Sequence, residues 1–248
     1  MVTQAIHSTF QRPAPVAAPA PVVRELPADL ETPVSVYLKL AGQGPSFLLE
    51  SVTGGEQLAR YSFIGVHPTA AYVLRAGAVE RWHLPSGAIT RVPVEGDPLE
   101  YIRAEIGAYR PAAISGLPRF SGGLVGYLGY EIIRHFEPSV GVGPHPDLPD
   151  GIFLQTDTLV AFDHAFGKLV LIANIRPEEN GRGRADAEAR LDAIEQRLAQ
   201  PLPDLPAPLG EPASTELRSN VTREQFTQAV RRAKEHIAAG DIFQVVLS

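Results

Sequence analysis

Short apolar runs separated by turn-forming residues limit the folds that this 248-residue chain can adopt. They span residues 46–51, 60–65, 70–75, 79–84 and 88–93, and glycine or proline interrupts the chain between neighbouring runs. Short strands at regular spacing, with turns between them, are typical of antiparallel sheets. The pattern therefore predicts a meandering antiparallel sheet in the first half of the chain.

Helical signals lie on both sides of these runs. Apolar residues recur at helical spacing over 33–42 and over 184–200, and Pro98 opens a helix that continues through residue 108. Later apolar runs at 152–163 and 168–176 are separated by a hairpin signal. Together these elements predict an α+β fold in which a mostly antiparallel β-sheet is layered with helices.

Proline-rich segments divide the chain. Residues 12–27 are rich in proline and alanine, so we expect residues 1–27 to form a disordered arm. Residues 201–214 contain five prolines and are predicted to be a linker between a region at 28–200 and a terminal region at 215–248.

The terminal region contains a helix followed by an apolar run. Thr222 and Gln225 form a capping-box pattern, and Gly240 supplies the helix stop. Residues Ile242 to Leu247 are apolar and β-branched, which predicts a strand. Because a strand needs a partner, and nothing here resembles a finishing signal, we expect the polypeptide to be incomplete.

Composition excludes several classes of function. A net charge of −6 argues against a nucleic-acid or anionic-membrane surface, which would need clustered Lys and Arg. The absence of cysteine excludes disulfides, thiolate metal sites and a cysteine nucleophile, and it fits a cytoplasmic protein. No run approaches the ~20 apolar residues of a membrane span, so no membrane partner is expected.

Generic motifs yield no catalytic constellation. The seven histidines are scattered, and neither a metalloprotease helix motif nor a nucleophile elbow nor a phosphate-binding loop is present. Gly122, Gly123, Gly126 and Gly129 do not make a dinucleotide fingerprint, so we predict that they allow close backbone packing in a sheet.

Five blocks follow one another along the chain: Thr32–Leu40, Ser46–Ser51, Arg60–Gly65, Gly122–Glu131 and Gly240–Ser248. In this order they resemble the N-terminal half of the anthranilate synthase component I family, chorismate-utilising large subunits of tryptophan biosynthesis. The resemblance covers residues 32–248.

The resemblance implies a cytoplasmic lyase that converts chorismate and ammonia to anthranilate and pyruvate and is feedback-inhibited by L-tryptophan. Ammonia comes from glutamine through a glutamine amidotransferase partner, component II. Aminodeoxychorismate synthase component I of the folate pathway is an alternative, as is a non-catalytic regulatory module that binds tryptophan.

Family members are much longer than this chain, and by resemblance the part absent here binds Mg²⁺ and most of chorismate. Residues 28–200 would then be the regulatory region, and residues 215–248 the truncated start of the catalytic domain. We therefore expect no metal site in this chain and no synthase activity from it alone.

The resemblance also suggests where tryptophan binds. Glu50 and Ser51 match a family motif that contacts the inhibitor, whose ammonium needs a carboxylate and whose indole needs an apolar slot. A basic residue further along contributes in some relatives. Ungapped counting places that position at Tyr61, with Arg60 adjacent, and both assignments stay open.

Gln244 is the candidate active-site residue. By resemblance, the relatives that form isochorismate or salicylate have a lysine at the matching position, and this lysine activates water to attack chorismate. The amide of Gln244 cannot act as a base in this way. Glutamine can hydrogen-bond ammonia or orient the substrate. Gln244 therefore favours an aminating enzyme, although it does not distinguish the two aminating families.

Overall fold

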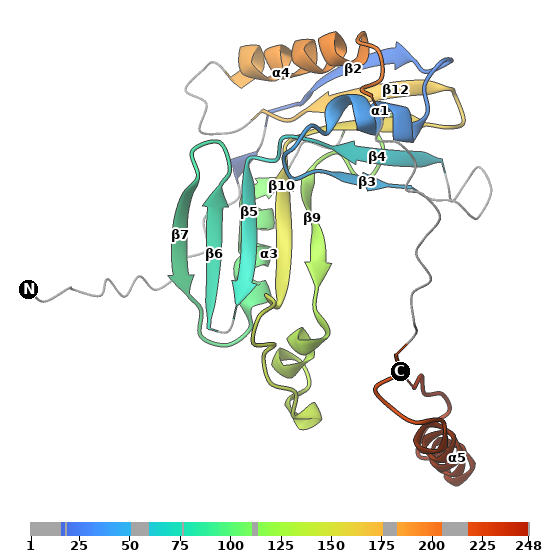
Figure 1. Cartoon of the computed structure of the whole chain (residues 1–248). Coiled ribbons are helices and arrows are strands. Elements are labelled where there is room, and N and C mark those ends of the chain that lie inside the picture. Colours follow the sequence, from blue (N-terminus) through green and yellow to red (C-terminus); the bar gives the residue numbers. More distant parts are fainter. Residues whose placement is uncertain are drawn as a thin grey trace, which may run out of the picture. The chain divides into compact units, whose positions relative to one another are not determined.

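The computed structural model describes residues 16–17, 19–50, 60–75, 77–110, 114–175, 183–204 and 218–247. The chain divides into two units, residues 1–203 and 204–248. Two five-stranded antiparallel sheets with helices packed on them make the first unit an α+β structure, which confirms the predicted fold class (Figure 1).

The first sheet is covered by helices on one face. In spatial order its strands are β2 (Val22–Pro27), β12 (Lys168–Ala173), β11 (Thr158–Asp163), β4 (Tyr61–Gly65) and β3 (Phe47–Leu49). Helices α1 (Pro33–Leu40) and α4 (Gly183–Leu198) lie over this sheet (Figure 1). Ile64, Val160 and Leu171 of the sheet and Val36 and Leu191 of the helices are fully buried in the core between them.

Local sequence explains both helices. Thr32 caps α1 through a capping box with Ser35, and Pro33 occupies the first turn, where its missing N–H has no cost. In α4 the apolar positions predicted to share one side are buried, as amphipathic spacing requires. They are Ala187, Leu191, Ile194 and Leu198.

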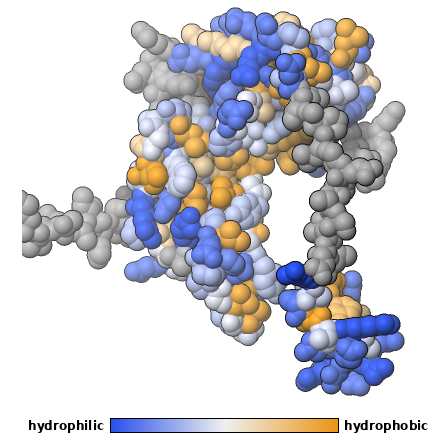
Figure 2. All heavy atoms as spheres, viewed as in Figure 1, coloured by the Kyte–Doolittle hydropathy of each residue, from blue (hydrophilic) through white to orange (hydrophobic). Residues whose placement is uncertain are grey.

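The second sheet comprises β7 (Ala88–Pro93), β6 (Ala78–His83), β5 (Ala70–Arg75), β10 (Gly151–Thr156) and β9 (Gly123–Leu128), in that order. Tyr72 and Leu74 of β5 pack with Tyr101 and Ile102 of helix α3 (Pro98–Ala108). Figure 2 shows apolar side chains gathered on the opposite face of this sheet. The strand register places one apolar row across it, composed of Ile89, Trp82, Ala71, Leu154 and Val125.

The chain passes between the two sheets twice. β4 leads into β5 through residues 66–69, and β10 leads into β11 through Asp157 alone. The expected single strand at 152–163 is therefore divided between two sheets. Four consecutive polar residues, Gln155 to Thr158, interrupt the apolar run at this break, a signal that the prediction of a single strand overlooked.

A hydrogen-bond network holds this crossing. Thr69 Oγ1 donates to Asp157 Oδ2 over 2.8 Å, and the backbone N–H of Asn174 donates to the carbonyl oxygen of Asp157 over 2.8 Å. Asn174 Nδ2 in turn donates to the carbonyl oxygen of Ser121 over 2.6 Å. These bonds satisfy part of the buried polar groups at the crossing, while Thr156 Oγ1 and Asn174 Oδ1 have no hydrogen-bond partner among the described residues.

Shorter elements complete the first unit. β1 (Val16–Ala17) pairs in parallel with β8 (Tyr109–Arg110), and two 3₁₀ helices, Tyr130–His135 and Pro138–Val140, follow β9. Arg134 donates through both Nη groups to the buried carboxylate of Asp150, at 2.8 and 2.5 Å. This pair ties the first 3₁₀ helix to the start of β10.

The prediction of a disordered arm through residue 27 is wrong for its last residues. Val22–Pro27 forms β2, which pairs with β12 along its whole length. Val22 is 6% exposed because it packs into the core of the first sheet. Proline content suggested an arm, but Pro27 ends this edge strand, a position at which proline is compatible with a sheet.

The second unit consists of helix α5 (Arg223–Ala239) and the residues around it. Thr222 and Gln225 form the expected capping box, and Gly240 takes a positive φ at the helix end. No strand forms at 242–247, contrary to the sequence-based prediction. Phe243 is 97% exposed and Val246 82% exposed, and a strand pattern without a pairing partner does not produce a strand.

None of the helices in the described ranges combines the length and the apolar character needed to cross a membrane.

The predicted packing role is observed for Gly122 and Gly126 of the glycine-rich block, but not for Gly123, where a Cβ would meet nothing within 4 Å. A Cβ on Gly126 would lie 1.9 Å from the carbonyl oxygen of Ile152, and one on Gly122, whose φ is +144°, would lie 2.3 Å from Asn174 Nδ2. Both contacts are far shorter than van der Waals separation. These two glycines therefore allow β9 to approach β10 and the crossing.

We predict that Gly126→Ala lowers the free energy of unfolding by about 1–3 kcal/mol, because the added methyl group must displace backbone atoms of β10. Gly143→Ala is the matched control, since a Cβ there meets nothing within 4 Å. Urea denaturation at neutral pH measures both variants. Equal stability of the two would contradict the close-approach explanation.

Candidate functional site

Three of the four predicted inhibitor-site residues lie at one end of the β3–β4 hairpin. Leu49 pairs with Phe63, so the chain leaves β3 at Glu50 at the end where Arg60 and Tyr61 enter β4. Glu50 is exposed. Ser51 lies outside the described residues. The topology thus places Glu50 at the same end of the hairpin as both candidates for the basic position.

Arg60 is already engaged within the fold. Its Nε and Nη2 donate to the two carboxylate oxygens of Asp163, at 3.1 and 2.8 Å. The guanidinium also lies over the rings of Tyr61 and Phe166, 4.8 and 4.9 Å from their centroids. Arg60 therefore fastens the start of β4 to the end of β11.

Asp163 is the buried member of this pair, with 1% of its side chain exposed. Burial acts to raise the pKa of Asp163. Hydrogen bonds from Arg60 and from the backbone N–H groups of Ala165 and Phe166 act in the opposite direction and outweigh burial, so the pKa lies below its usual value. The same pairing raises the pKa of the Arg60 guanidinium. The carboxylate of Asp163 thus stays ionised at neutral pH.

An aromatic cluster lines the face of the first sheet opposite α1 and α4. Phe63 and Phe120 meet edge to face with their ring centroids 5.3 Å apart, and Phe47 and Tyr61 lie within 6.5 Å of one or other of these rings. Such pairs add to the stability gained by burial. The cluster gives the β3–β4 hairpin an apolar surface of the kind that an indole ring requires.

The proposed active-site residue belongs to the second unit. Gln244 is exposed and follows α5 in a segment without regular secondary structure. The expected position of Gln244 within a strand is therefore not observed. A sheet position for this residue would require pairing partners that the described residues do not supply to it.

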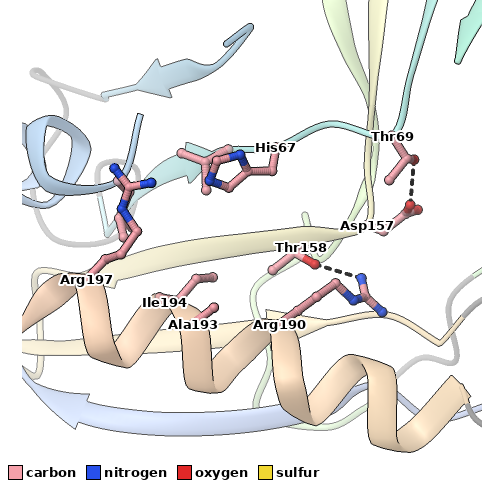
Figure 3. Close-up of a pocket in the computed structure, with 10 residues that line it drawn as sticks. His67, Thr69, Asp157, Thr158, Arg190, Ala193, Ile194 and Arg197 are labelled. Atoms are coloured by element: carbon pink, nitrogen blue, oxygen red, sulfur yellow. Dashed lines mark hydrogen bonds between the residues drawn. The ribbon is translucent and has the colours of Figure 1, made fainter. Parts of the chain in front are cut away.

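A pocket that sequence reasoning missed lies on α4, at the opposite end of β4 from Arg60 (Figure 3). Arg190, Ala193, Ile194 and Arg197 face it at the spacing i, i+3, i+4 and i+7, which puts them on one side of the helix. This spacing was visible in the sequence. What the sequence could not show was that His67 and Asp157, both distant along the chain, lie opposite these positions.

A resident metal ion is not supported by the described part of the chain. Among those residues, no three His, Asp or Glu side chains are grouped as metal ligands would be.

Comparisons with known proteins give a consistent result. A family model described as chorismate binding enzyme matches residues 44–248. Anthranilate synthase component 1 of Pseudomonas putida is 41% identical over 236 residues, which cover 92% of this chain and 47% of that protein. The Thermus thermophilus counterpart is 42% identical over 230 residues, which cover 89% and 45% respectively. The chain thus spans about half the length of the curated relatives it matches.

A solved structure supports the fold. The crystal structure of anthranilate synthase component I from Streptococcus pneumoniae TIGR4 matches with a TM-score of 0.55 at 24% sequence identity. The match covers 87% of this chain and 46% of that chain.

We predict that Asp163→Asn destabilises the protein by about 1–3 kcal/mol at pH 7, because Arg60 loses its charged partner. The pKa of Asp163 is lowered in the folded protein, so its stabilising contribution is complete above the ordinary Asp pKa of about 4. The contribution disappears as the pH falls through the lower, folded-state value.

Urea denaturation as a function of pH tests this linkage, with the exposed Asp29→Asn as control. The difference in unfolding free energy between the parent protein and Asp163→Asn should shrink as the pH is lowered below about 4. A difference that stays constant with pH would show that the ion pair is not its source.

Proposed function

The chain belongs to the chorismate-binding enzyme family, and from this membership we propose that it is the N-terminal, regulatory part of an anthranilate synthase component I. The match of residues 44–248 to the family model carries the proposal, and relatives of the anthranilate-forming class at 41–42% identity support it. The reaction proposed for the whole enzyme converts chorismate and ammonia to anthranilate and pyruvate. A glutamine amidotransferase partner supplies the ammonia.

The regulatory role is assigned to the end of the β3–β4 hairpin. The carboxylate of Glu50 would accept hydrogen bonds from the ammonium group of tryptophan. The neighbouring aromatic cluster offers an apolar surface for the indole ring. Arg60 is a positioning residue in this proposal, because its guanidinium already pairs with Asp163. Tyr61 is then the remaining candidate for the position that is basic in some relatives.

Gln244 is proposed to contact ammonia or chorismate. Its amide both donates and accepts hydrogen bonds, but it cannot take a proton from water at neutral pH. This chemistry suits orientation of a neutral amine nucleophile better than activation of water. The aminodeoxychorismate-forming alternative has the same requirement, and the names of the matched relatives favour anthranilate.

We assign the binding of Mg²⁺ only to a protein longer than this chain. The described residues contain no group of three carboxylate or imidazole ligands, so they do not fit a Mg²⁺ site by themselves. No step assigned to Glu50, Tyr61 or Gln244 depends on the metal. Most of the contacts with chorismate and the elimination of pyruvate are assigned to residues outside this chain.

We predict that residues 1–248 alone form no anthranilate from chorismate, ammonium and Mg²⁺, because the chain spans 47% of the P. putida relative. Anthranilate fluorescence in a continuous assay measures this directly, with the complete P. putida enzyme as positive control. Turnover by the purified chain would refute the division of labour proposed above.

Tryptophan control can be tested in a chimera in which this chain replaces the matching half of the P. putida enzyme. Glu50→Ala should raise the tryptophan concentration for half-inhibition about tenfold or more, since a hydrogen bond to a charged group is lost, with turnover in the absence of tryptophan unchanged. Glu95→Ala, at an exposed position in a loop, is the control.

Two results would contradict the regulatory assignment. One is a parent chimera that forms anthranilate but does not respond to tryptophan. The other is equal inhibition of the Glu50→Ala and Glu95→Ala variants.

A further inference from the structure

A pocket of about 240 Å³ lies where α4 faces the two segments that cross between the sheets (Figure 3). Its apolar part is formed by Leu40, Val66 and Ile194, which are 0%, 2% and 5% exposed. Pockets for drug-sized ligands usually enclose about 300–1,000 Å³. The volume therefore suits a single ring or a short branched chain, and it is too small for a nucleotide.

Two arginines flank the apolar part. Arg190 is fixed in place, because its Nη1 donates to Thr158 Oγ1 and its Nη2 to the carbonyl oxygen of Asn174, both over 2.7 Å. Arg197 is held more lightly, through one hydrogen bond of 3.2 Å from Nε to the carbonyl oxygen of Lys39. Among the described residues no carboxylate forms an ion pair with Arg197.

The charges of the lining side chains favour an anion. Arg190 and Arg197 contribute two positive charges to the lining, and Asp157 contributes one negative charge. The carboxylate of Asp157 is directed to Thr69, whose hydroxyl donates to it over 2.8 Å. Arg197 has no carboxylate partner among the described residues, so a ligand with one negative charge complements its guanidinium, whereas a cation would be repelled by it.

His67 gives an independent indication of a site. It is the one non-glycine residue with positive φ in the described part of the chain, at +50°, and its side chain lines the pocket. Histidine tolerates this conformation better than most residues, but it remains less stable than the ordinary regions. Local backbone strain of this kind is found preferentially at ligand-binding positions.

We propose that this pocket binds a small organic monocarboxylate with an aromatic or branched apolar body. The apolar part of the ligand fills the space between Val66 and Ile194, and its carboxylate accepts hydrogen bonds from the Nη groups of Arg197. Because the walls come from α4 and from both crossing segments, the bound ligand links the two sheets. This site is separate from Glu50 and does not depend on the proposed chorismate reaction.

Titration of the ¹⁵N-labelled 248-residue chain by NMR tests the proposal, with benzoate as the probe and benzyl alcohol and benzylamine as its neutral and cationic counterparts. Benzoate should cause saturable shifts of the His67 and Ala193 amide signals, and neither counterpart should do so in the same concentration range. Inorganic phosphate should not compete, because it lacks an apolar body.

Variants of α4 identify the anion contact. Arg197→Gln should weaken benzoate binding about tenfold or more, and Arg197→Lys should weaken it less, because lysine keeps the charge but loses the planar fork. Arg184→Gln removes the same charge from an exposed position paired with Glu188 and should leave affinity within about twofold. Melting temperatures of the three variants confirm that each is folded.

The proposal is overturned by any of three results. The first is a titration in which benzoate does not saturate these signals, the second is equal binding of benzyl alcohol and benzoate, and the third is an Arg184→Gln variant that weakens binding as much as Arg197→Gln. In the first case the pocket has no carboxylate ligand of this class, and in the other two Arg197 does not supply the recognition of charge.

Discussion

The passage of the chain from one sheet to the other at Asp157 is the constraint on which the first unit depends. β10 and β11 are continuous apart from this one residue, so the two sheets cannot be placed independently. The Asp157 carboxylate accepts a hydrogen bond from Thr69 at the other crossing segment, and its carbonyl oxygen accepts one from Asn174. Both crossings and the end of β12 are thereby joined through polar groups that would be costly to bury unpaired.

The two proposed ligand sites lie at opposite ends of β4, which leads into one of these crossings. At its beginning, Arg60 pairs with Asp163 and the β3–β4 hairpin presents Glu50. Beyond its end, Val66 and His67 face α4. The short strand β4 therefore separates the proposed tryptophan site from the proposed carboxylate site, and the first sheet fixes the positions of both.

Sequence patterns predicted the elements well where the cause of structure is local. The capping boxes at Thr32 and Thr222 and the buried side of α4 were legible because they depend on residues a few positions apart. The division at Asp157 and the strand at Val22–Pro27 were missed, since both depend on pairing with distant strands. The run after Gly240 has strand composition, yet no described strand pairs with it.

The same limit applies to the sites. A motif located Glu50 and the neighbourhood of Tyr61, but it could not show that Arg60 is paired with a carboxylate 103 residues away. Likewise, the spacing of Arg190 and Arg197 is a local property, whereas the pocket needs His67 and Asp157 as well. Residue types and spacing identify candidates, and only the tertiary arrangement decides which of their charges remain available to a ligand.

The central functional claim is tested most directly by the chimera in which this chain replaces the matching half of the P. putida enzyme. The purified chimera should be incubated with chorismate, ammonium and Mg²⁺, and its products identified by mass spectrometry. The account predicts anthranilate and pyruvate in equal amounts. Formation of 4-amino-4-deoxychorismate, or no conversion of chorismate, would contradict it.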